Sequence, residues 1–388
     1  MHIGFLTTEY PISSLKSGGI GIFIKHISHL LLRKCKSSNI SISILYWGNK
    51  ICDRIFDDGI SIIPISQPYN NRFSFYSNRK YLCKVLNKLI NEEGLDIIET
   101  IDWEGPMAFC NLSVPIVTRL HGSNVYFDYL LNKETPWLLK KLESKALHTS
   151  TAYIGVSQQA LNFTQKLFNL SSQKKTTVIY NPVDFDYISQ FYHVNKNSST
   201  VTILYFGTIV KKKGVFDIPL IFNELCKVND NLKLKLIGRD TIVNGKSTWE
   251  TCRSFFTSQA LRYVEYLGYL PYDETLMHIN EADICLFPNH VETFGLVLLE
   301  AMFMRKAIIC SNIDCFQEIV DHDKDAIQCT VGNIKEFVFA LQQLVNNVDK
   351  RVKLANNAYQ KAITKFSTDI IVQQNLSFYE ELLKNRSL

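Results

Sequence analysis

Two glutamates separated by seven residues, Glu292 and Glu300, flank a stretch where an apolar segment gives way to a helical pattern. An apolar strand is expected to end at Phe287, and a helix is expected to begin near Thr293 or Phe294. The rise of an α-helix then places Glu300 roughly 12 Å along the axis from Glu292. A long ligand with hydroxyl groups at both ends could therefore be held by one carboxylate at each end.

The start of this expected helix predicts an anion site. Its first backbone N–H groups, those of Phe294, Gly295 and Leu296, have no carbonyl partner within a helix. Together with the positive end of the helix dipole, they suit a diphosphate. The alternatives are that Glu292 caps the helix and that Glu300 is solvated. The apolar residues around Glu300 weaken the second alternative, because such a carboxylate is seldom buried without a partner.

A basic loop follows the expected strand Val201–Phe206 and contains three consecutive lysines. A lysine in such a loop can reach a diphosphate and stabilise the charge that builds on it as it leaves. Lys211, Lys212 and Lys213 are the candidates, and an ordinary solvated run is the alternative. Arg239 is another cation that could assist.

Glycines and a histidine follow expected strands nearer the N-terminus. Gly18 and Gly19 lie in the first strand-to-helix turn, where the absence of side chains lets backbone amides approach a phosphate. His121 comes just after the carboxyl end of a strand, where ligands of such sheets bind. Glycine-rich turns are routine in α/β proteins and a lone histidine is more often structural, so these residues alone are weak evidence for a binding site. Asp102 and Trp103 follow another strand and are acceptor-side candidates.

Strand-like and helix-like segments alternate along the chain, which predicts parallel strands joined by crossover helices. The expected fold class is α/β, with two Rossmann-like domains facing across a cleft. We expect an N-terminal acceptor-side domain at 1–190 and a C-terminal donor domain at 200–365, separated by the polar stretch His193–Thr200. The last helix, 366–388, is expected to pack back on the N-terminal domain. Ligands of such sheets bind at the carboxyl ends of the strands.

The expected elements can be placed by residue. Strands of the first domain are expected at His2–Thr8, Ile40–Tyr46, Ser61–Ile65, Leu95–Thr100, Pro115–Leu120, Ala152–Val156 and Thr177–Tyr180. Strands of the second are expected at Val201–Phe206, Leu232–Ile237, Tyr263–Leu267, Asp283–Phe287 and Lys306–Cys310. Helices of the C-terminal half are expected at Gly214–Val228, Trp249–Ala260, Thr293–Met304, Ile334–Val345, Lys350–Phe366 and Thr368–Leu383.

These features together resemble the family 4 glycosyltransferases, which are retaining enzymes with the GT-B fold. The resemblance rests on the Glu-x7-Glu motif, Lys213-Gly214, the histidine-glycine pair and the N-terminal glycine loop. Flanking matches are Leu267-Gly268, Tyr272, Ala282-Asp283, Phe287-Pro288, Ser311 and Glu318-Ile319-Val320. It implies catalytic roles for His121, Glu292 and Lys213. It also implies donor binding by Gly18, Gly19, Thr208, Lys213, Arg239, Phe294, Gly295, Leu296 and Glu300.

One departure from the family pattern concerns the expected phosphate site. Thr208 stands where the family usually has arginine in a Gly-Arg pair. Threonine can donate one hydrogen bond but brings no charge, so Lys211, Lys212 or Arg239 could compensate. This departure puts the strength of phosphate binding in question.

Composition restricts the function classes. The net charge of +5 is too small to indicate nucleic-acid binding, and the sequence lacks an arginine-rich or aromatic-interleaved patch. The ten cysteines are scattered without a Cys-x-x-Cys pair, so neither a metal site nor a cofactor is expected. The N-terminus does not resemble a secretory signal, which predicts a cytoplasmic protein.

An amphipathic stretch, Thr135–Leu147, suggests peripheral contact with the inner face of the membrane. Trp137, Leu138 and Leu142 lie beside lysines, a combination suited to an anionic surface. An ordinary surface helix is the alternative.

The predicted function is therefore transfer of a sugar from a nucleotide-sugar donor to a saccharide or lipid-linked acceptor, in cell-surface polysaccharide biosynthesis. A sugar phosphorylase or sugar-phosphate synthase is an alternative on the same fold. A non-catalytic nucleotide-sugar-binding scaffold is a second alternative, which Thr208 would favour. An NAD enzyme is disfavoured, because the first turn lacks a proper Gly-x-Gly-x-x-Gly.

Overall fold

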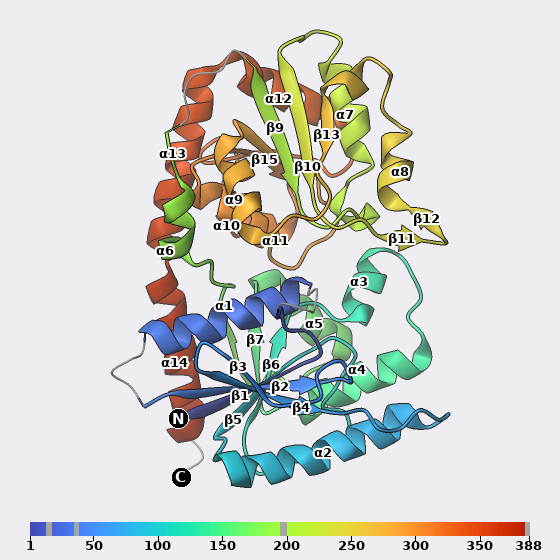
Figure 1. The fold of residues 1–388 in the computed structure, drawn as a ribbon, viewed down its shortest axis with the longest axis vertical. Helices are drawn as coiled ribbons and strands as arrows, with labels where there is room; N and C mark the ends of the chain where they lie inside the picture. Colours follow the sequence, from blue (N-terminus) through green and yellow to red (C-terminus); the bar gives the residue numbers. More distant parts are fainter. Residues whose placement is uncertain (13–17, 35–38, 195–199, 385–388) are drawn as a thin grey trace. The chain divides into compact units, whose positions relative to one another are not determined.

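The computed structural model describes residues 1–12, 18–34, 39–194 and 200–384, and its fold is drawn in Figure 1. The chain divides into two compact units, Met1–Pro182 with Thr368–Leu388, and Val183–Ser367. Each unit contains a twisted, mainly parallel sheet with helices on its faces, so the chain is an α/β protein with two Rossmann-like units.

The first unit is built on an eight-stranded sheet. In spatial order its strands are β3 (Ile55–Asp57), β4 (Ile60–Ile65), β2 (Ser41–Trp47), β1 (His2–Thr7), β5 (Ile97–Ile101), β6 (Ile116–Leu120), β7 (Ala152–Gly155) and β8 (Lys175–Val178). All pairs are parallel except β3 with β4, which form an antiparallel edge. Its helices are α1 (Gly19–Lys34), α2 (Ser74–Glu93), α3 (Asn124–Leu130), α4 (Trp137–Thr149), α5 (Gln158–Phe168) and α14 (Thr368–Lys384).

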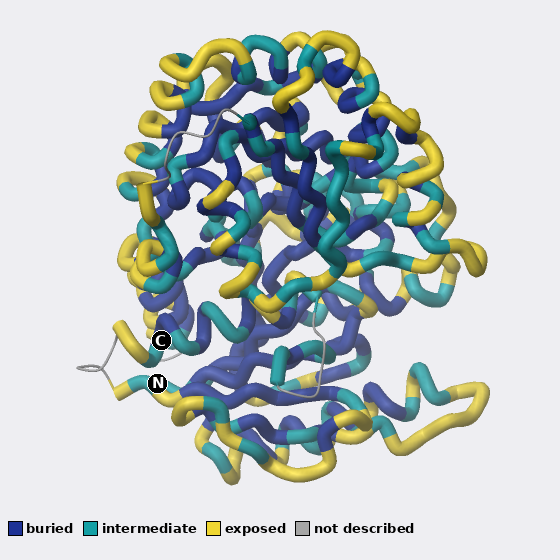
Figure 2. Tube along the Cα trace, turned by 45° about the horizontal axis from the view of Figure 1, so that its top comes forward, coloured by how far each residue is buried: buried dark blue, intermediate teal, exposed yellow. Residues whose placement is uncertain are grey.

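Alternating side chains of these strands bury themselves on opposite faces of the sheet, as the two-residue period requires. In β1, Phe5 joins a core cluster with residues of α1 and α14, such as Ile27. The next residue, Leu6, joins a second cluster with Leu86 of α2 and Leu142 of α4. Both faces of this sheet are therefore covered by helices, and Figure 2 shows its strands as a buried layer.

The second unit contains a six-stranded, fully parallel sheet. In spatial order its strands are β13 (Val264–Tyr266), β10 (Leu232–Ile237), β9 (Val201–Phe206), β14 (Ile284–Phe287), β15 (Ala307–Ser311) and β16 (Ile327–Cys329). A separate hairpin pairs β11 (Ile242–Val243) with β12 (Lys246–Ser247). Its helices are α6 (Phe185–Ile188), α7 (Asp217–Leu225), α8 (Thr248–Arg253), α9 (Tyr272–Glu281), α10 (Leu296–Phe303), α11 (Asp314–Gln317), α12 (Ile334–Asn346) and α13 (Val348–Lys365), with short 3-10 turns η1 (Ser189–Phe191), η2 (Lys211–Lys213) and η3 (Ala260–Tyr263).

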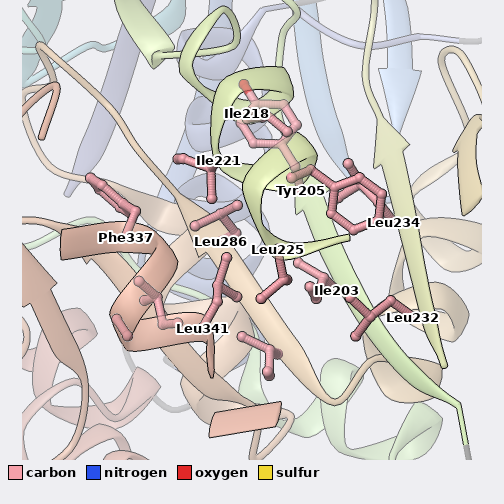
Figure 3. Packing of buried hydrophobic residues seen from close by; sticks show 14 of the residues in the cluster. Ile203, Tyr205, Ile218, Ile221, Leu225, Leu232, Leu234, Leu286, Phe337 and Leu341 are labelled. Carbon is pink, nitrogen blue, oxygen red and sulfur yellow. The ribbon is translucent and has the colours of Figure 1, made fainter. Parts of the chain in front are cut away.

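Helices α7 and α12 cover one face of the second sheet. Ile221 of α7 and Leu341 of α12 are fully buried against strand residues such as Ile203. Figure 3 shows these side chains interdigitating between the helices and the strands. Burying each such aliphatic side chain stabilises the fold by about 1.5–3 kcal/mol relative to leaving it exposed.

The expected strands form within one or two residues of the predicted positions, but three helices, α7, α8 and α10, differ from expectation. The helix expected over Trp249–Ala260 ends at Arg253 as α8, and the chain forms the turn η3 only from Ala260. The helix expected from Gly214 begins at Asp217, because Gly214 adopts φ +69°, which no helix interior contains. The short edge strand β3 and the hairpin had no clear periodic signal.

The second unit begins at Val183, whereas the polar stretch suggested a boundary near residue 200. The segment after Val183 forms α6, and its Phe185 ring lies 5.2 Å from the ring of Phe303 in α10. At the other end of the chain, Thr368–Leu388 belongs to the first unit.

Candidate functional site

An ion pair in the second unit joins two of the predicted residues. Lys213 Nζ, from the turn η2 after β9, donates to Glu292 Oε2 over 2.9 Å. Asn289 Nδ2 donates to the same oxygen over 3.3 Å, and the Thr293 N–H donates to Oε1 over 3.1 Å. Burial opposes ionisation of Glu292, but Lys213 and Lys212 outweigh it, so the pKa of this carboxyl lies below its ordinary value.

Backbone contacts between two loops position this ion pair. The N–H groups of His290 and Val291 both donate to the carbonyl of Lys212, over 3.0 and 3.1 Å. Gly214 makes the approach possible, since a Cβ built on it would lie 1.8 Å from the Pro288 carbonyl oxygen. A lysine turn and a strand-to-helix loop are thus held against each other, each supplying one member of the pair.

The second glutamate of the motif is half-buried and hydrogen-bonded, not fully solvated. Glu300, in α10, accepts a hydrogen bond of 3.0 Å from Tyr272 Oη at the start of α9. Burial raises the pKa of Glu300 to about 7, with Tyr272 and the charge of Lys213 acting in the opposite direction. Lys213 therefore influences both glutamates, and Glu300 changes charge near neutral pH.

The helix that carries Glu300 starts later than expected. α10 begins at Leu296, and the preceding Gly295 adopts φ +103°, a left-handed conformation that excludes it and Phe294 from the helix. Of the three amides expected at the helix start, only that of Leu296 lies in its first turn. Among the described residues, no side chain caps this end, so the alternative interpretation of Glu292 as a helix cap is wrong.

The two positions expected to add to the phosphate site lie at the carboxyl ends of β9 and β10. The backbone oxygen of Thr208 accepts a hydrogen bond of 3.0 Å from Tyr205 Oη. Arg239 follows β10, is exposed, and makes no ion pair with any residue that the structure describes. Its backbone oxygen accepts the N–H of Ile209 over 2.9 Å, which links the ends of the two strands.

In the first unit, His121 follows β6 and is 9% exposed. The centroid of its ring lies 4.6 Å from that of the Phe23 ring, in an edge-to-face arrangement. The Arg119 guanidinium lies 4.9 Å from the same Phe23 centroid. Burial and, after it, the charge of Arg119 lower the pKa of His121 to about 3. The imidazole is neutral at physiological pH and can exchange hydrogen bonds but carries no positive charge.

Asp102 faces inward and supports the His121 segment. Its two carboxylate oxygens accept the backbone N–H groups of His121 and Gly122, over 3.1 and 3.0 Å. Burial and the nearby Glu143 raise the pKa of Asp102 to about 7. Trp103 is half-buried and packs near Phe127, 6.5 Å between ring centroids. The structure thus gives Asp102 a supporting position, with its oxygens already engaged.

A second buried carboxylate, missed from the sequence, continues this support. Glu143 of α4 is fully buried and accepts the backbone N–H groups of Asn124 and Val125, over 2.9 and 3.0 Å. It also accepts the N–H of Glu104 over 3.2 Å. Its sequence signal was an acid between Leu142 and Ala146, on the face of the helix that is otherwise apolar.

Gly18 and Gly19 lie at the start of α1, as expected. The amide of Gly18 donates to the carboxylate of Glu9 over 2.9 Å, and a Cβ on Gly18 would meet that carboxylate at 2.8 Å. Around Gly19 a Cβ would meet nothing within 4 Å. The sequence pattern did not point to Glu9, which brings a negative charge to the turn where a phosphate was expected.

Arg119 is the largest fully buried polar side chain of the first unit and joins the sheet to the last helix. Its Nε donates to Glu99 Oε1 over 2.7 Å. Asn375 and Tyr379 of α14 complete the group, with Tyr379 Oη donating to Glu99 Oε2. Charged residues inside the apolar strands β5 and β6 were the signal that could have revealed this pair.

The described residues offer neither a cluster of metal ligands nor a helix able to cross a membrane. Within the described ranges, no group of three or more His, Cys, Asp or Glu side chains is arranged to hold a metal ion. None of the described helices combines the length and apolar character that crossing a bilayer demands.

Two family models match the chain and together extend over most of it. The model described as Glycosyltransferase Family 4 matches residues 18–187. The model described as Glycosyl transferases group 1 matches residues 189–361. The match to the second unit contains the paired lysine and both glutamates, and the match to the first contains the histidine.

Individual proteins agree with these families. The capsular polysaccharide biosynthesis glycosyltransferase CapM of Staphylococcus aureus is 26% identical over 260 residues, covering 64% of this chain and 66% of CapM. Among solved structures, sucrose-phosphate synthase from Thermosynechococcus elongatus superposes with a TM-score of 0.80 at 15% identity, covering 99% of both chains. HepE from Anabaena, in complex with UDP and glucose, gives a TM-score of 0.72 at 16% identity, covering 97% of this chain and 99% of HepE.

Proposed function

Because this chain belongs to the family 4 glycosyltransferases, enzymes of the GT-B fold that transfer sugars, we propose that it uses a nucleoside diphosphate sugar and retains the configuration of the transferred sugar. The second unit binds the donor and the first contributes the acceptor side.

The observation that carries this proposal is the Lys213–Glu292 pair of 2.9 Å, close to the start of α10. When a donor binds, the ammonium of Lys213 contacts the diphosphate and stabilises the negative charge that develops as the glycosidic bond breaks. The amides at the start of α10, from Leu296 onward, supply hydrogen bonds to the same group. Thr208 and Arg239 extend this phosphate site.

The two glutamates bind different parts of the donor. Glu292, kept ionised by its lysine neighbours, accepts hydroxyls of the transferred sugar. Glu300, in its half-buried position beside Tyr272, accepts the ribose hydroxyls. HepE, a structural neighbour, was solved with UDP and glucose, so UDP-sugars are the first donors to test.

The residues of the first unit complete the assignment. His121 hydrogen-bonds the donor sugar as a neutral imidazole, since its pKa of about 3 excludes the cationic form at physiological pH. Gly18 and Gly19 offer backbone amides to the donor phosphate once Glu9 yields the amide that it now occupies. Trp103 lies near the acceptor side, and Asp102 holds His121 in place.

The acceptor in this proposal is a saccharide or a lipid-linked saccharide. The transfer takes place in the cytoplasm and belongs to the biosynthesis of cell-surface polysaccharide. Support comes from the 26% identity to a capsular polysaccharide glycosyltransferase. No metal ion is assigned a step, because Lys213 and the helix start supply the charge stabilisation.

The decisive experiment combines donor binding with product analysis. A panel of UDP-, GDP- and ADP-sugars is screened for protection against thermal unfolding, since a ligand at 100 times its Kd stabilises the folded state by about 2.7 kcal/mol. Release of nucleoside diphosphate is then followed with saccharide and lipid-linked acceptors, and the anomeric configuration of the product is read by NMR.

Matched substitutions separate a specific site from a general loss of folding. Lys213→Ala and Glu300→Ala are compared with Lys227→Ala and Glu224→Ala, an exposed pair in the same unit. The proposal requires loss of transfer in the first two only. Wild-type turnover in Lys213→Ala and Glu300→Ala would overturn it, as would formation of a sugar phosphate from inorganic phosphate in place of glycoside formation.

A further inference from the structure

Helix α4 presents a stripe of exposed side chains that the proposed active site does not use. Trp137, Lys141 and Lys145 recur every fourth residue and therefore share one helical face. Trp137 is 67% exposed, and Lys141 Nζ lies 4.3 Å from its ring centroid. The opposite face of α4 is buried in the core, so this stripe is not needed for packing within the unit.

Helix α2 presents a second stripe of the same kind. Phe73 immediately precedes the helix and is 63% exposed, and Tyr76, Lys80 and Lys84 follow it at helical spacing. Lys80 Nζ lies 5.8 Å from the Tyr76 ring centroid. As in α4, aromatic rings stand near the first turn and lysines continue along the same face.

A phenylalanine between the two helices makes the stripes continuous. The Phe109 ring lies 5.0 Å from the Tyr76 ring, in an edge-to-face arrangement. Lys145 Nζ lies 5.4 Å from the centroid of the same Phe109 ring. Together these residues form what we call the aromatic–lysine surface: Phe73, Tyr76, Lys80, Lys84, Phe109, Trp137, Lys141 and Lys145. The helices that carry it, α2 and α4, are labelled in Figure 1.

The charges of this surface are uncompensated. Among the residues that the structure describes, none of its four lysines forms an ion pair, and neither does the adjacent Lys140. Other lysines of the same unit are paired with acids, for example Lys25 with Asp57 at 3.0 Å and Lys34 with Asp369 at 3.1 Å. A surface that joins unpaired lysines to exposed aromatic rings is complementary to a negatively charged, partly apolar partner.

We propose that the aromatic–lysine surface binds the anionic face of a lipid bilayer. The rings enter the boundary between headgroups and acyl chains, where flat amphipathic side chains such as tryptophan and tyrosine are favoured. The lysines remain at the level of the phosphates, with their aliphatic stems along the rings. This inference is independent of the sugar-transfer assignment, because it uses none of the residues proposed to bind the donor.

The test is sedimentation of the full chain with vesicles of phosphatidylcholine, with and without about 30 mol% phosphatidylglycerol. The double variant Lys141→Ala/Lys145→Ala is compared with the control Lys50→Ala/Lys166→Ala. The control removes two exposed lysines of the first unit that lie outside the aromatic–lysine surface and form no ion pair with any described residue. The first double variant should bind anionic vesicles at least tenfold more weakly at about 0.1 M salt, and the control should match the wild type.

Trp137 supplies an independent readout. Its fluorescence should shift to the blue on addition of anionic vesicles, and the Trp137→Phe variant should lose that shift while its thermal unfolding is unchanged. Equal binding to neutral and anionic vesicles, no binding by the wild type, or equal loss in the control variant would each overturn the proposal. Normal donor binding accompanied by failure to bind vesicles would leave the proposed transfer reaction intact and remove only this inference.

Discussion

Lys213 and Glu292, 79 residues apart in the chain, form a 2.9 Å ion pair between the turn after β9 and the loop after β14. The pair lies at the carboxyl ends of neighbouring parallel strands, where α/β sheets bind their ligands. It holds the lysine ammonium in place and favours the ionised form of the glutamate.

Removing the lysine should reduce turnover more than binding. We expect Lys213→Ala to lower kcat by roughly 10²–10³-fold, because charge developing on the diphosphate loses its nearest cation. Steady-state kinetics with saturating donor measure this effect. Lys211→Ala is the control, since Lys211 is exposed and outside the pair, and its kcat should stay within about twofold of the wild type. An unaltered kcat in Lys213→Ala would contradict the role.

Donor affinity should depend on pH through Glu300. Its pKa of about 7 means that the carboxylate is protonated below pH 7 and cannot accept two ribose hydroxyls. The donor Kd should therefore rise roughly tenfold between pH 8 and pH 6. Titration calorimetry across this range is the measurement, and Glu300→Gln should bind weakly with no such dependence.

The Tyr272→Phe variant tests the direction in which the pKa of Glu300 shifts. The hydrogen bond from Tyr272 lowers the pKa of Glu300, so its removal should move the midpoint of the pH dependence upward. A midpoint that stays fixed or moves downward would mean that another group controls donor binding.

The fold of the second unit should depend on the absence of a side chain at Gly214. Gly214→Ala combines a φ of +69° with a contact of 1.8 Å to the Pro288 carbonyl, and should destabilise the protein by more than about 3 kcal/mol. Gly245→Ala is the matched control, because Gly245 has φ +75° but no atom lies within 4 Å of the point that a Cβ would occupy. It should cost only about 1 kcal/mol. Denaturant unfolding of both variants measures the two losses of stability. The difference between them gives the cost of the steric clash at Gly214 beyond the cost of the positive φ that both positions share.

The buried network around Arg119 should stabilise the first unit. Glu99→Gln leaves the guanidinium without its charged partner and should lower the free energy of unfolding by about 3–5 kcal/mol. Tyr379→Phe removes one hydrogen bond and should lower it by about 1–2 kcal/mol. Tyr129→Phe, at a 60% exposed tyrosine, is the control and should be neutral. Unchanged unfolding in Glu99→Gln would contradict this view of the network.

Stability should also report on Asp102. The pKa of Asp102 is about 7 in the folded protein, above that of an aspartate in the unfolded chain. Its contribution to the free energy of unfolding is therefore fully present below the unfolded pKa and is lost as pH rises through 7. Asp102→Asn removes this loss. The stability of the variant relative to the wild type should therefore increase from pH 5 to pH 8 in thermal unfolding, and a constant difference would contradict the raised pKa.

The order of strands and helices follows from patterns that are local in sequence. Val201–Phe206 and Leu232–Ile237 form strands with the predicted bounds. The first is an almost continuous apolar run and the second alternates leucine with lysine, and both are flanked by polar residues. The recognised family and the two-unit α/β fold follow from the same patterns. The placement of individual site residues in a donor complex stays a prediction.

What the sequence did not reveal are contacts made across long separations. The shift of the α10 start from Thr293 to Leu296 depends on Gly295, whose left-handed backbone brings its Cα against the Phe316 ring, where a Cβ would lie 2.5 Å away. Glu9, Glu143 and Glu99 each meet their partners only after folding, so helical or strand periodicity could not identify them. Charged residues within apolar faces were the available signal.

The Arg119 network also bears on how the chain is made. The polar partners of Arg119 on α14 lie 256 and 260 residues further along the chain. During synthesis, Arg119 in the sheet of the first unit therefore lacks its partners on α14 until the entire second unit has been translated. The second unit is one continuous segment and can fold first, so the first unit is completed last although its strands precede the second unit in the chain.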